Sequence, residues 1–378
     1  MAHLPKKRRI AFEATHKKGF RPFFPSEHKK PDVSGTYPGK AAPAQSWNWG
    51  LCLIDIEIQS KVTKDHINER LHAFKPGTVH DIPLAHIAKN GRNILAASGA
   101  CFCFVIGVYG DTARIYRFDR ARAVISPSFD LRSTDVLRRF LWRIVHPKIC
   151  QLPDGSIPRT PTLLGLDTTI TTLTMKEETW LRNKLINIHN YDYKTAKTRA
   201  NQSKKMLAMY RPLDSDTNVA PSPRWCYSVG APLSHSSGLF SRATKVLKVL
   251  FQEDPYHFFA VKDSWQHVSR RNEIEFYNHI RKCYPSNYPS GVAQALGAID
   301  FSALHGHKTD SFEPYGTQPY IPDPDLHRRH ARLTMYPVGE EISSVNCTRD
   351  LVEAIRDAIE GTLFEYCPSF FSLLVHRA

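Results

Sequence analysis

The sequence predicts an α+β protein with two ordered parts, an N-terminal mixed α/β domain and a second domain built on a small antiparallel sheet with helices. In the first part, strand-like apolar runs and stretches with helical apolar spacing alternate without a strict βαβ rhythm. In the second part, short strands and helices follow a polar, proline-bearing break at 221–223. The length of 378 residues, with 42% hydrophobic and 23% charged residues, fits two or three domains of a globular protein.

Residues 1–40 form a basic leader. They carry ten lysines and arginines against Glu13, Glu27 and Asp32, and so supply +7 of the formal net charge of +15. Because this stretch contains proline and glycine and lacks apolar periodicity, we expect it to be disordered. The run Pro5–Arg9 is typical of a nuclear localisation signal or a nucleic-acid contact, and a solvated leader is the alternative interpretation.

The composition indicates neither export nor a membrane. No apolar segment follows the basic N-terminus, as a secretory signal would require, and no apolar run approaches the ~18 residues of a membrane helix. Of the eight cysteines only Cys101 and Cys103 lie close together, and their alternate spacing in a strand suits packing better than zinc binding. We therefore expect eight reduced thiols and a cytoplasmic or nuclear location.

Residues 41–180 are expected to form the N-terminal domain. Its expected elements are a buried strand at 49–58, a helix at 81–97, a hairpin at 101–118, a strand at 120–129 and an amphipathic helix at 134–146. Residues 181–224 are polar and basic, which predicts a linker or a loosely held helix.

Residues 225–378 are expected to form the second domain. Its expected elements are strands at 227–229, 244–251 and 258–262, a helix at 271–281, strands at 291–301 and 331–335, and a helix at 350–366 with Thr348 as its cap.

Lys262 ends an apolar strand, and a helical stretch carrying Glu273 follows it. In such an arrangement the lysine ammonium binds the α- and β-phosphates of a nucleotide, and the helical glutamate holds the lysine in place. Glu273 is favoured over Glu275 because Phe276 and Tyr277, at +3 and +4, would anchor the helix against the sheet. Taken alone, the two residues also fit a partly buried surface lysine and a solvated glutamate.

Several local runs carry a resemblance to a known family. They are Asp119-Arg120, Leu164–Asp167, Ala260–Trp265, Asn272–Tyr277, Arg329–Leu333 with Val338-Gly339, and the terminal His376-Arg377. Over roughly residues 41–378 the chain resembles the fungal-type protein kinases (the FunK group). The resemblance implies that 225–378 is a partial protein-kinase-like domain, with the small lobe, the hinge and the first large-lobe helix.

The resemblance also implies ATP and Mg²⁺ as cofactors and protein serine or threonine hydroxyls as phosphate acceptors. The residues that it assigns to ATP binding are Gly238, Val246, Ala260, Lys262 and Glu273. It assigns no metal ligand in this chain. The protein substrate or partner is not indicated by any motif.

The sequence departs from the family pattern at two places. The glycine-rich loop, between about Ser237 and Val246, has only Gly238, and Ser241 and Ala243 stand where the pattern prefers glycine. His376-Arg377 is a remnant of the catalytic loop, with Ala378 where Asp is expected, so no complete catalytic set is present. We therefore expect a truncated, inactive chain whose apolar faces at 350–366 and 370–375 promote association.

Two other functions remain open at this stage. The first is a pseudokinase-like scaffold that uses the basic leader to bind a protein or nucleic acid. The second is a nuclease, because Asp55–Gln59 is similar to the Asp…Glu-x-Lys arrangement, although Gln59 replaces the lysine. One Pro-, Asp- and Arg-rich stretch is expected to be a solvated loop that holds no metal. Its charged residues and histidines are Asp323, Asp325, His327, Arg328, Arg329 and His330.

Overall fold

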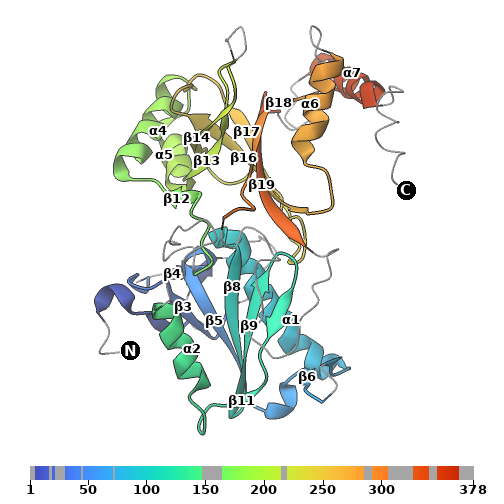
Figure 1. The fold of residues 1–378 in the computed structure, drawn as a ribbon. Coiled ribbons are helices and arrows are strands. Elements are labelled where there is room, and N and C mark those ends of the chain that lie inside the picture. The colour runs from blue at the N-terminus through green and yellow to red at the C-terminus, as the bar shows by residue number, and fades with distance from the viewer. Residues whose placement is uncertain are drawn as a thin grey trace.

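The computed structural model describes residues 5–16, 19–21, 30–43, 46–70, 73–146, 164–213, 219–284, 292–304, 327–339 and 347–365. Two separate β-sheets dominate the described chain, and Figure 1 shows one above the other with helices against each. This arrangement confirms the predicted α+β class. The remnant His376-Arg377, the run 370–375, Asp323 and Asp325 lie outside the described residues.

The first sheet has the strand order β1-β3-β5-β8-β9-β10, with β11 also paired to β9. Its strands are β1 (Phe12–Ala14), β3 (Val33–Thr36), β5 (Cys52–Gln59), β8 (Phe102–Tyr109), β9 (Thr112–Asp119), β10 (Ala123–Ile125) and β11 (Phe129–Asp130). β5 and β8 are parallel and the other pairs are antiparallel. The predicted strand at 49–58 and the hairpin at 101–118 are therefore confirmed.

Two helices cover opposite faces of this sheet (Figure 1). α1 (Thr78–Ser98) packs Ile87, Ile94 and Leu95 against the face that carries Cys103 and Val105. α2 (Val136–Val145) packs its apolar side against the face that carries Ile54 and Ile106. Alternate residues of β8 thus enter two different cores, which is why the strand is almost continuously apolar.

Short elements complete this half of the chain. They are the pair β2 (Gly19–Arg21) and β4 (Ser46–Asn48), the pair β6 (Ile67–Asn68) and β7 (Ala73–Phe74), and the 3-10 turns η1 (Lys6–Arg8), η2 (Trp49–Leu51) and η3 (Val62–Lys64).

The leader differs from its prediction in the residues that the structure describes. β1 pairs with β3, and β3 pairs with β5, so both strands extend the sheet. Ile10, Ser34 and Thr36 are buried. Composition misled the prediction, because a strand of only three or four residues carries little periodicity and is held by partners far along the chain.

The second sheet has the strand order β12-β13-β14-β16-β17-β19-β18, with β15 also paired to β16. Its strands are β12 (Ile170–Thr172), β13 (Lys204–Tyr210), β14 (Ser222–Ser228), β15 (Ser234–His235), β16 (Lys245–Phe251), β17 (Phe259–His267), β18 (Gln294–Asp300) and β19 (Arg328–Tyr336). All pairs are antiparallel. The sheet curls, because β13 also lies against β18 and β19.

Residues 181–224, expected to be a linker, are largely regular structure. α4 (Met175–Asn187) begins with a capping box of Thr174 and Glu177, and α5 (Tyr193–Gln202) begins at an Asp192 cap. The two helices bury Leu181, Leu185, Ala196 and Ala200 against the second sheet. The polar composition reflects their exposed sides, so these residues belong to the second half of the molecule.

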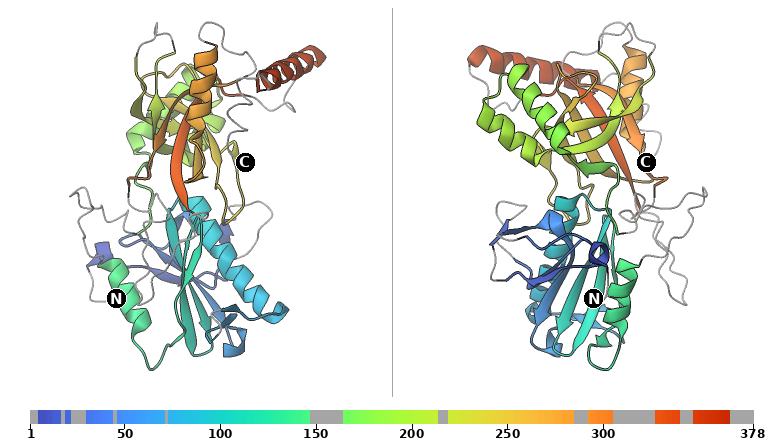
Figure 2. Two further views of the ribbon diagram at one scale, coloured as in Figure 1. Left: turned by 45° about the vertical axis from the view of Figure 1, so that its right-hand side comes forward. Right: turned by 90° about the vertical axis from the view of Figure 1, so that its left-hand side faces the viewer.

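Two further helices lie beside the second sheet. α6 (Glu273–Cys283) follows β17, and α7 (Thr348–Glu365) projects away from the sheet in Figure 2. The exposed fractions of Val352, Ile355 and Ile359 on α7 are 59%, 47% and 56%, as expected for an apolar side that lacks a covering partner among the described residues. None of the described helices has the length and apolar character needed to cross a membrane.

Candidate functional site

Lys262 and Glu273 meet at one side of the second sheet. The Lys262 Nζ atom lies 2.7 Å from Oε1 and 2.8 Å from Oε2 of Glu273, and both side chains are about one-fifth exposed, at 21% and 22%. Glu273 is the first residue of α6, where the helix dipole favours a carboxylate. The Asn272 side chain caps the same turn by accepting a hydrogen bond from the Ile274 amide.

Val246 and Ala260 lie on the same face of the sheet as Lys262. Val246 is the direct cross-strand partner of Lys262 on β16, and Ala260 precedes Lys262 by two residues on β17. Ala260 pairs in turn with Met335 on β19, and the Tyr277 hydroxyl of α6 lies 3.6 Å from the Met335 sulfur. The structure thus brings together four of the five residues that the sequence assigned to one site.

Gly238, the fifth, lies in the loop between β15 and β16. The Ser236 amide donates to the Thr244 carbonyl across the base of this loop. The Ser241 hydroxyl donates to the Gly238 carbonyl and accepts from the Ala243 amide. Ala243 has a φ of 43°, the left-handed region that favours glycine, so a non-glycine residue holds a glycine-type conformation here at a cost of about 1 kcal/mol.

Arg242, in the same loop, was not assigned a role from the sequence. Its Nη2 atom lies 3.6 Å from Glu273 Oε2, and its side chain is 47% exposed. It is the sole basic residue between Ser236 and Thr244, which is the signal that could have identified it. Glu273 therefore stands between two cations, one from β17 and one from the loop.

The opposite face of β17 carries a buried charged network centred on Asp263. The His330 Nε2 atom lies 2.6 Å from Asp263 Oδ1, and Arg332 Nε donates to the same oxygen at 3.1 Å. Burial alone would raise the pKa of Asp263, but the adjacent His330 and Arg332 hold it well below its usual range. Trp265 stacks on His330 with ring centroids 5.0 Å apart.

Arg332 extends this network to the segment that joins the two sheets. Its side chain is fully buried and donates to the Leu207 carbonyl at 2.6 Å and to Thr169 Oγ1 at 3.2 Å. Its Nη2 atom also lies 3.3 Å from Asp167 Oδ2. Burial would lower the pKa of the Arg332 guanidinium, but Asp263 and Asp167 raise it above its ordinary value, so the arginine remains charged.

The first residue of β16 bonds directly to the first half of the molecule. Lys245, the cross-strand neighbour of Asp263, donates from Nζ to the Ala96 carbonyl at the end of α1, at 2.6 Å. Arg120 donates to the adjacent Leu95 carbonyl, also at 2.6 Å.

Apolar packing reinforces this contact between the two halves. Cys101 and Phe102 of the first half pack in one cluster with Ala243 and Trp265 of the second. The Trp265 amide donates to the Arg242 carbonyl at 2.7 Å. The base of the loop is therefore fixed both to β17 and to the N-terminal domain.

Lys245 makes the stability of this joint depend on pH. Burial and the nearby Arg120 lower the pKa of Lys245 to about 8 in the folded chain. Between that pH and its ordinary pKa of about 10.4, the unfolded chain binds more protons, so this residue makes stability rise with pH in that window. From pH 7 to pH 10, we expect the free energy of unfolding of the unmodified protein to rise by up to about 2 kcal/mol more than that of Lys245→Met, which lacks this titrating group. Thermal unfolding at both pH values measures this, and an equal difference in Tm at both would contradict it.

A comparison with protein families matches the fungal protein kinase family over residues 73–296, more than half of the chain. The chain belongs to the fungal protein kinase family. The matched range includes β16, β17 and α6, and so contains Lys262 and Glu273. No curated protein and no solved structure matches the chain significantly.

The runs that suggested the fungal kinase family meet in space. Arg120, Asp167, Asp263, His330 and Arg332 come from four of those runs, and all line the joint between the two halves. The prediction that His330, Arg328 and Arg329 belong to a solvated loop is wrong, because all three lie on β19 and His330 is buried. The arginine-rich composition hid an apolar alternation that begins only at Ala331.

The two carboxylates of the suggested nuclease motif each contact a neighbouring side chain in the first half of the chain, and Asp55 Oδ2 is buried without a hydrogen-bond partner among the described residues. Asp55 is fully buried, accepts from the Ser34 hydroxyl at 2.8 Å, and has its pKa raised to about 7 by burial. Glu57 lies 2.8 Å from His86 Nδ1 and also accepts from Asn90. In the described ranges there is no group of three or more His, Cys, Asp or Glu side chains that could hold a metal ion.

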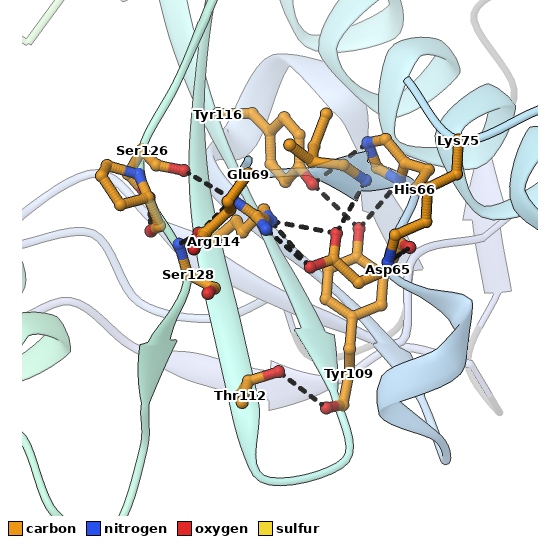
Figure 3. Close-up of polar contacts among 12 residues, drawn as sticks. Asp65, His66, Glu69, Lys75, Tyr109, Thr112, Arg114, Tyr116, Ser126 and Ser128 are labelled. Carbon is orange, nitrogen blue, oxygen red and sulfur yellow. Dashed lines mark hydrogen bonds and ion pairs between the residues drawn. The ribbon is translucent and has the colours of Figure 1, made fainter. Parts of the chain in front are cut away.

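A cavity of about 460 Å³ lies beside this sheet, against Glu69, Phe74 and Arg114. Figure 3 shows that the polar side chains beside it contact one another. Arg114 bonds both oxygens of Asp65, with its shortest contact at 2.7 Å, and Glu69 lies 3.1 Å from it. His66 contacts the hydroxyls of Tyr109 and Tyr116, which lie 2.9 Å from each other on the same buried side. These groups satisfy one another and stabilise the β6–β7 hairpin.

Proposed function

We propose that the fungal kinase chain binds ATP and that Lys262 contacts the phosphates. The contact of Lys262 with both oxygens of Glu273 carries this proposal. An ammonium group has three N–H donors, and among the described residues Glu273 accepts two of them, which leaves one to direct at a phosphate oxygen. Isolated partly exposed ion pairs add little stability, so positioning a cation is the better account of the pair.

The adenine would pack against the side chains of Val246 and Ala260. Both face the same way as Lys262, and alanine leaves room for a flat ring where a larger residue would not. Mg²⁺ would arrive bound to the ATP phosphates, where it neutralises charge. We infer that the phosphate acceptors of the family to which this chain belongs are protein serine and threonine hydroxyls.

Titration with ATP and with adenosine tests the proposal. Lys262→Ala is expected to weaken ATP binding at least about tenfold and to leave adenosine binding unchanged, because a hydrogen bond to a charged group contributes about 1.5–3 kcal/mol. Lys205→Ala is the matched control, since Lys205 lies on β13 of the same sheet, is 26% exposed, and is 2.6 Å from Glu177 of α4. The proposal fails if the two variants bind ATP equally well.

Phosphate transfer is a separate matter. We propose that residues 1–378 do not transfer phosphate on their own, because the sequence contains neither a His-Arg-Asp run nor an Asp-Phe-Gly run. These runs supply the base and the metal ligands of the reaction. In a radiolabelled phosphate assay with a general protein acceptor, the chain should match its Lys262→Ala variant. Turnover clearly above that variant would refute this.

A further inference from the structure

We propose that Arg242 is a second phosphate-binding residue of this site, where it takes over the role of a glycine-rich backbone. The inference rests on the proposed binding of ATP. It begins from the loop itself, which has Gly238 but Ser241 and Ala243 at the other glycine positions. A glycine-rich loop binds phosphate with backbone amides that can approach closely because no Cβ intervenes.

The backbone near Arg242 is already engaged elsewhere. The Ala243 amide bonds to Ser241 Oγ at 3.1 Å, and the Arg242 carbonyl accepts from the Trp265 amide at 2.7 Å. The Ala243 side chain is buried against Cys101, Phe102 and Trp265. These contacts hold the end of the loop against the N-terminal domain, so the Ala243 amide is not free to bind a phosphate.

The Arg242 side chain compensates for this loss. It extends to the same carboxylate that Lys262 contacts, with Nη2 3.6 Å from Glu273 Oε2. The pair is longer than the Lys262 contact and the side chain is 47% exposed, so the guanidinium can turn to a ligand at small cost. A guanidinium offers two parallel N–H donors to a phosphate, which a lysine cannot do.

The cations around this carboxylate indicate an anionic ligand. Arg242 and Arg270 both lower the pKa of Arg328, after the larger effect of burial, so three arginines gather close together. At Glu273 itself, the two cations Lys262 and Arg242 lie against one carboxylate. A polyphosphate would relieve this repulsion, and its terminal groups would gain most from a cation on the loop.

The test is a titration of the full chain with ATP, ADP, AMP and adenosine. Arg242→Ala should weaken ATP binding about tenfold, weaken ADP and AMP binding progressively less, and leave adenosine binding unchanged. Arg242→Lys should recover only part of the ATP affinity, because it restores the charge without the paired donors. Arg224→Ala is the matched control, since Arg224 is 50% exposed and lies 3.5 Å from Glu253 in the same half of the molecule.

Each alternative outcome has a separate meaning. If Lys262→Ala weakens ATP binding but Arg242→Ala does not, ATP binding stands and the role of Arg242 is refuted. An equal loss for ATP and adenosine would also refute it, since Arg242 would then only support the loop. Tighter ATP binding by Arg242→Ala would also refute it, since the arginine would then hinder the ligand. If the unmodified chain does not bind ATP, both the proposed function and this inference fail.

Discussion

Replacing Arg332 with methionine is expected to lower the free energy of unfolding by about 3–5 kcal/mol, because it removes the buried cation that two buried carboxylates share. Arg332 is fully buried and contacts both Asp263 and Asp167. Asp263 would keep His330, but Asp167 would lose its contact with a buried cation. The lost side chain also leaves the Leu207 carbonyl without this donor. Chemical denaturation monitored by tryptophan fluorescence measures the effect.

Arg329→Met is the control for this prediction. Arg329 lies on the same strand, but its side chain is 22% exposed and its contact with Asp300 is 3.6 Å long. Its replacement should cost less than about 1 kcal/mol. If Arg332→Met does not fold, adding Asp167→Asn should restore part of the stability by removing a buried charge. If Arg332→Met and Arg329→Met lower the free energy of unfolding equally, the buried network stabilises the fold no more than a partly exposed ion pair does.

Gly165→Ala should lower the free energy of unfolding by about 3 kcal/mol, from overpacking and backbone strain together. Gly165 has a φ of 84°, which disfavours any Cβ. A Cβ at this position would also overlap the Phe102 carbonyl oxygen and crowd the Phe102 ring. The Gly165 carbonyl accepts a hydrogen bond from the Cys101 amide at 2.8 Å, so the backbone at Gly165 cannot move away from Phe102 without losing that bond.

Gly99→Ala separates these two causes. Gly99 also has a positive φ, of 68°, but a Cβ there would meet only an Ile170 methyl at 3.7 Å, an ordinary contact. This variant should therefore show backbone strain alone, about 1 kcal/mol. Equal losses from the two variants, measured by thermal unfolding, would show that the close approach to Phe102 does not constrain the joint.

Sequence patterns and the family resemblance predicted the face of β17 that carries Lys262 better than the joint behind it. Lys262 and Glu273 are eleven positions apart, and strand and helix periodicity together with the family resemblance predicted their meeting. The network around Asp263 joins positions 167, 263 and 332, and no local pattern encodes such a contact. Resemblance to the family marked these residues, but it did not say that they meet.

The sequence predictions that rested on charged and polar composition were the least accurate. This composition suggested a disordered leader and a linker, whereas β1, β3, α4 and α5 are ordered through contacts with distant segments. It also suggested a solvated loop where β19 begins. In each case the polar side of an amphipathic element dominates the composition, and its few apolar residues are the ones that pack.

We infer that adjacent residues of β17 have different roles: Lys262 binds ATP, and Asp263 joins the two halves of the chain. The most direct test is to measure the Tm of Lys262→Ala and Asp263→Asn with and without saturating ATP. Lys262→Ala should keep the ligand-free Tm and lose the ATP-induced rise, because it removes a phosphate contact. Asp263→Asn should lower the ligand-free Tm by several degrees and keep a rise with ATP. If both variants change the ligand-free Tm and the ATP-induced rise in Tm in the same way, Lys262 and Asp263 do not have separate roles.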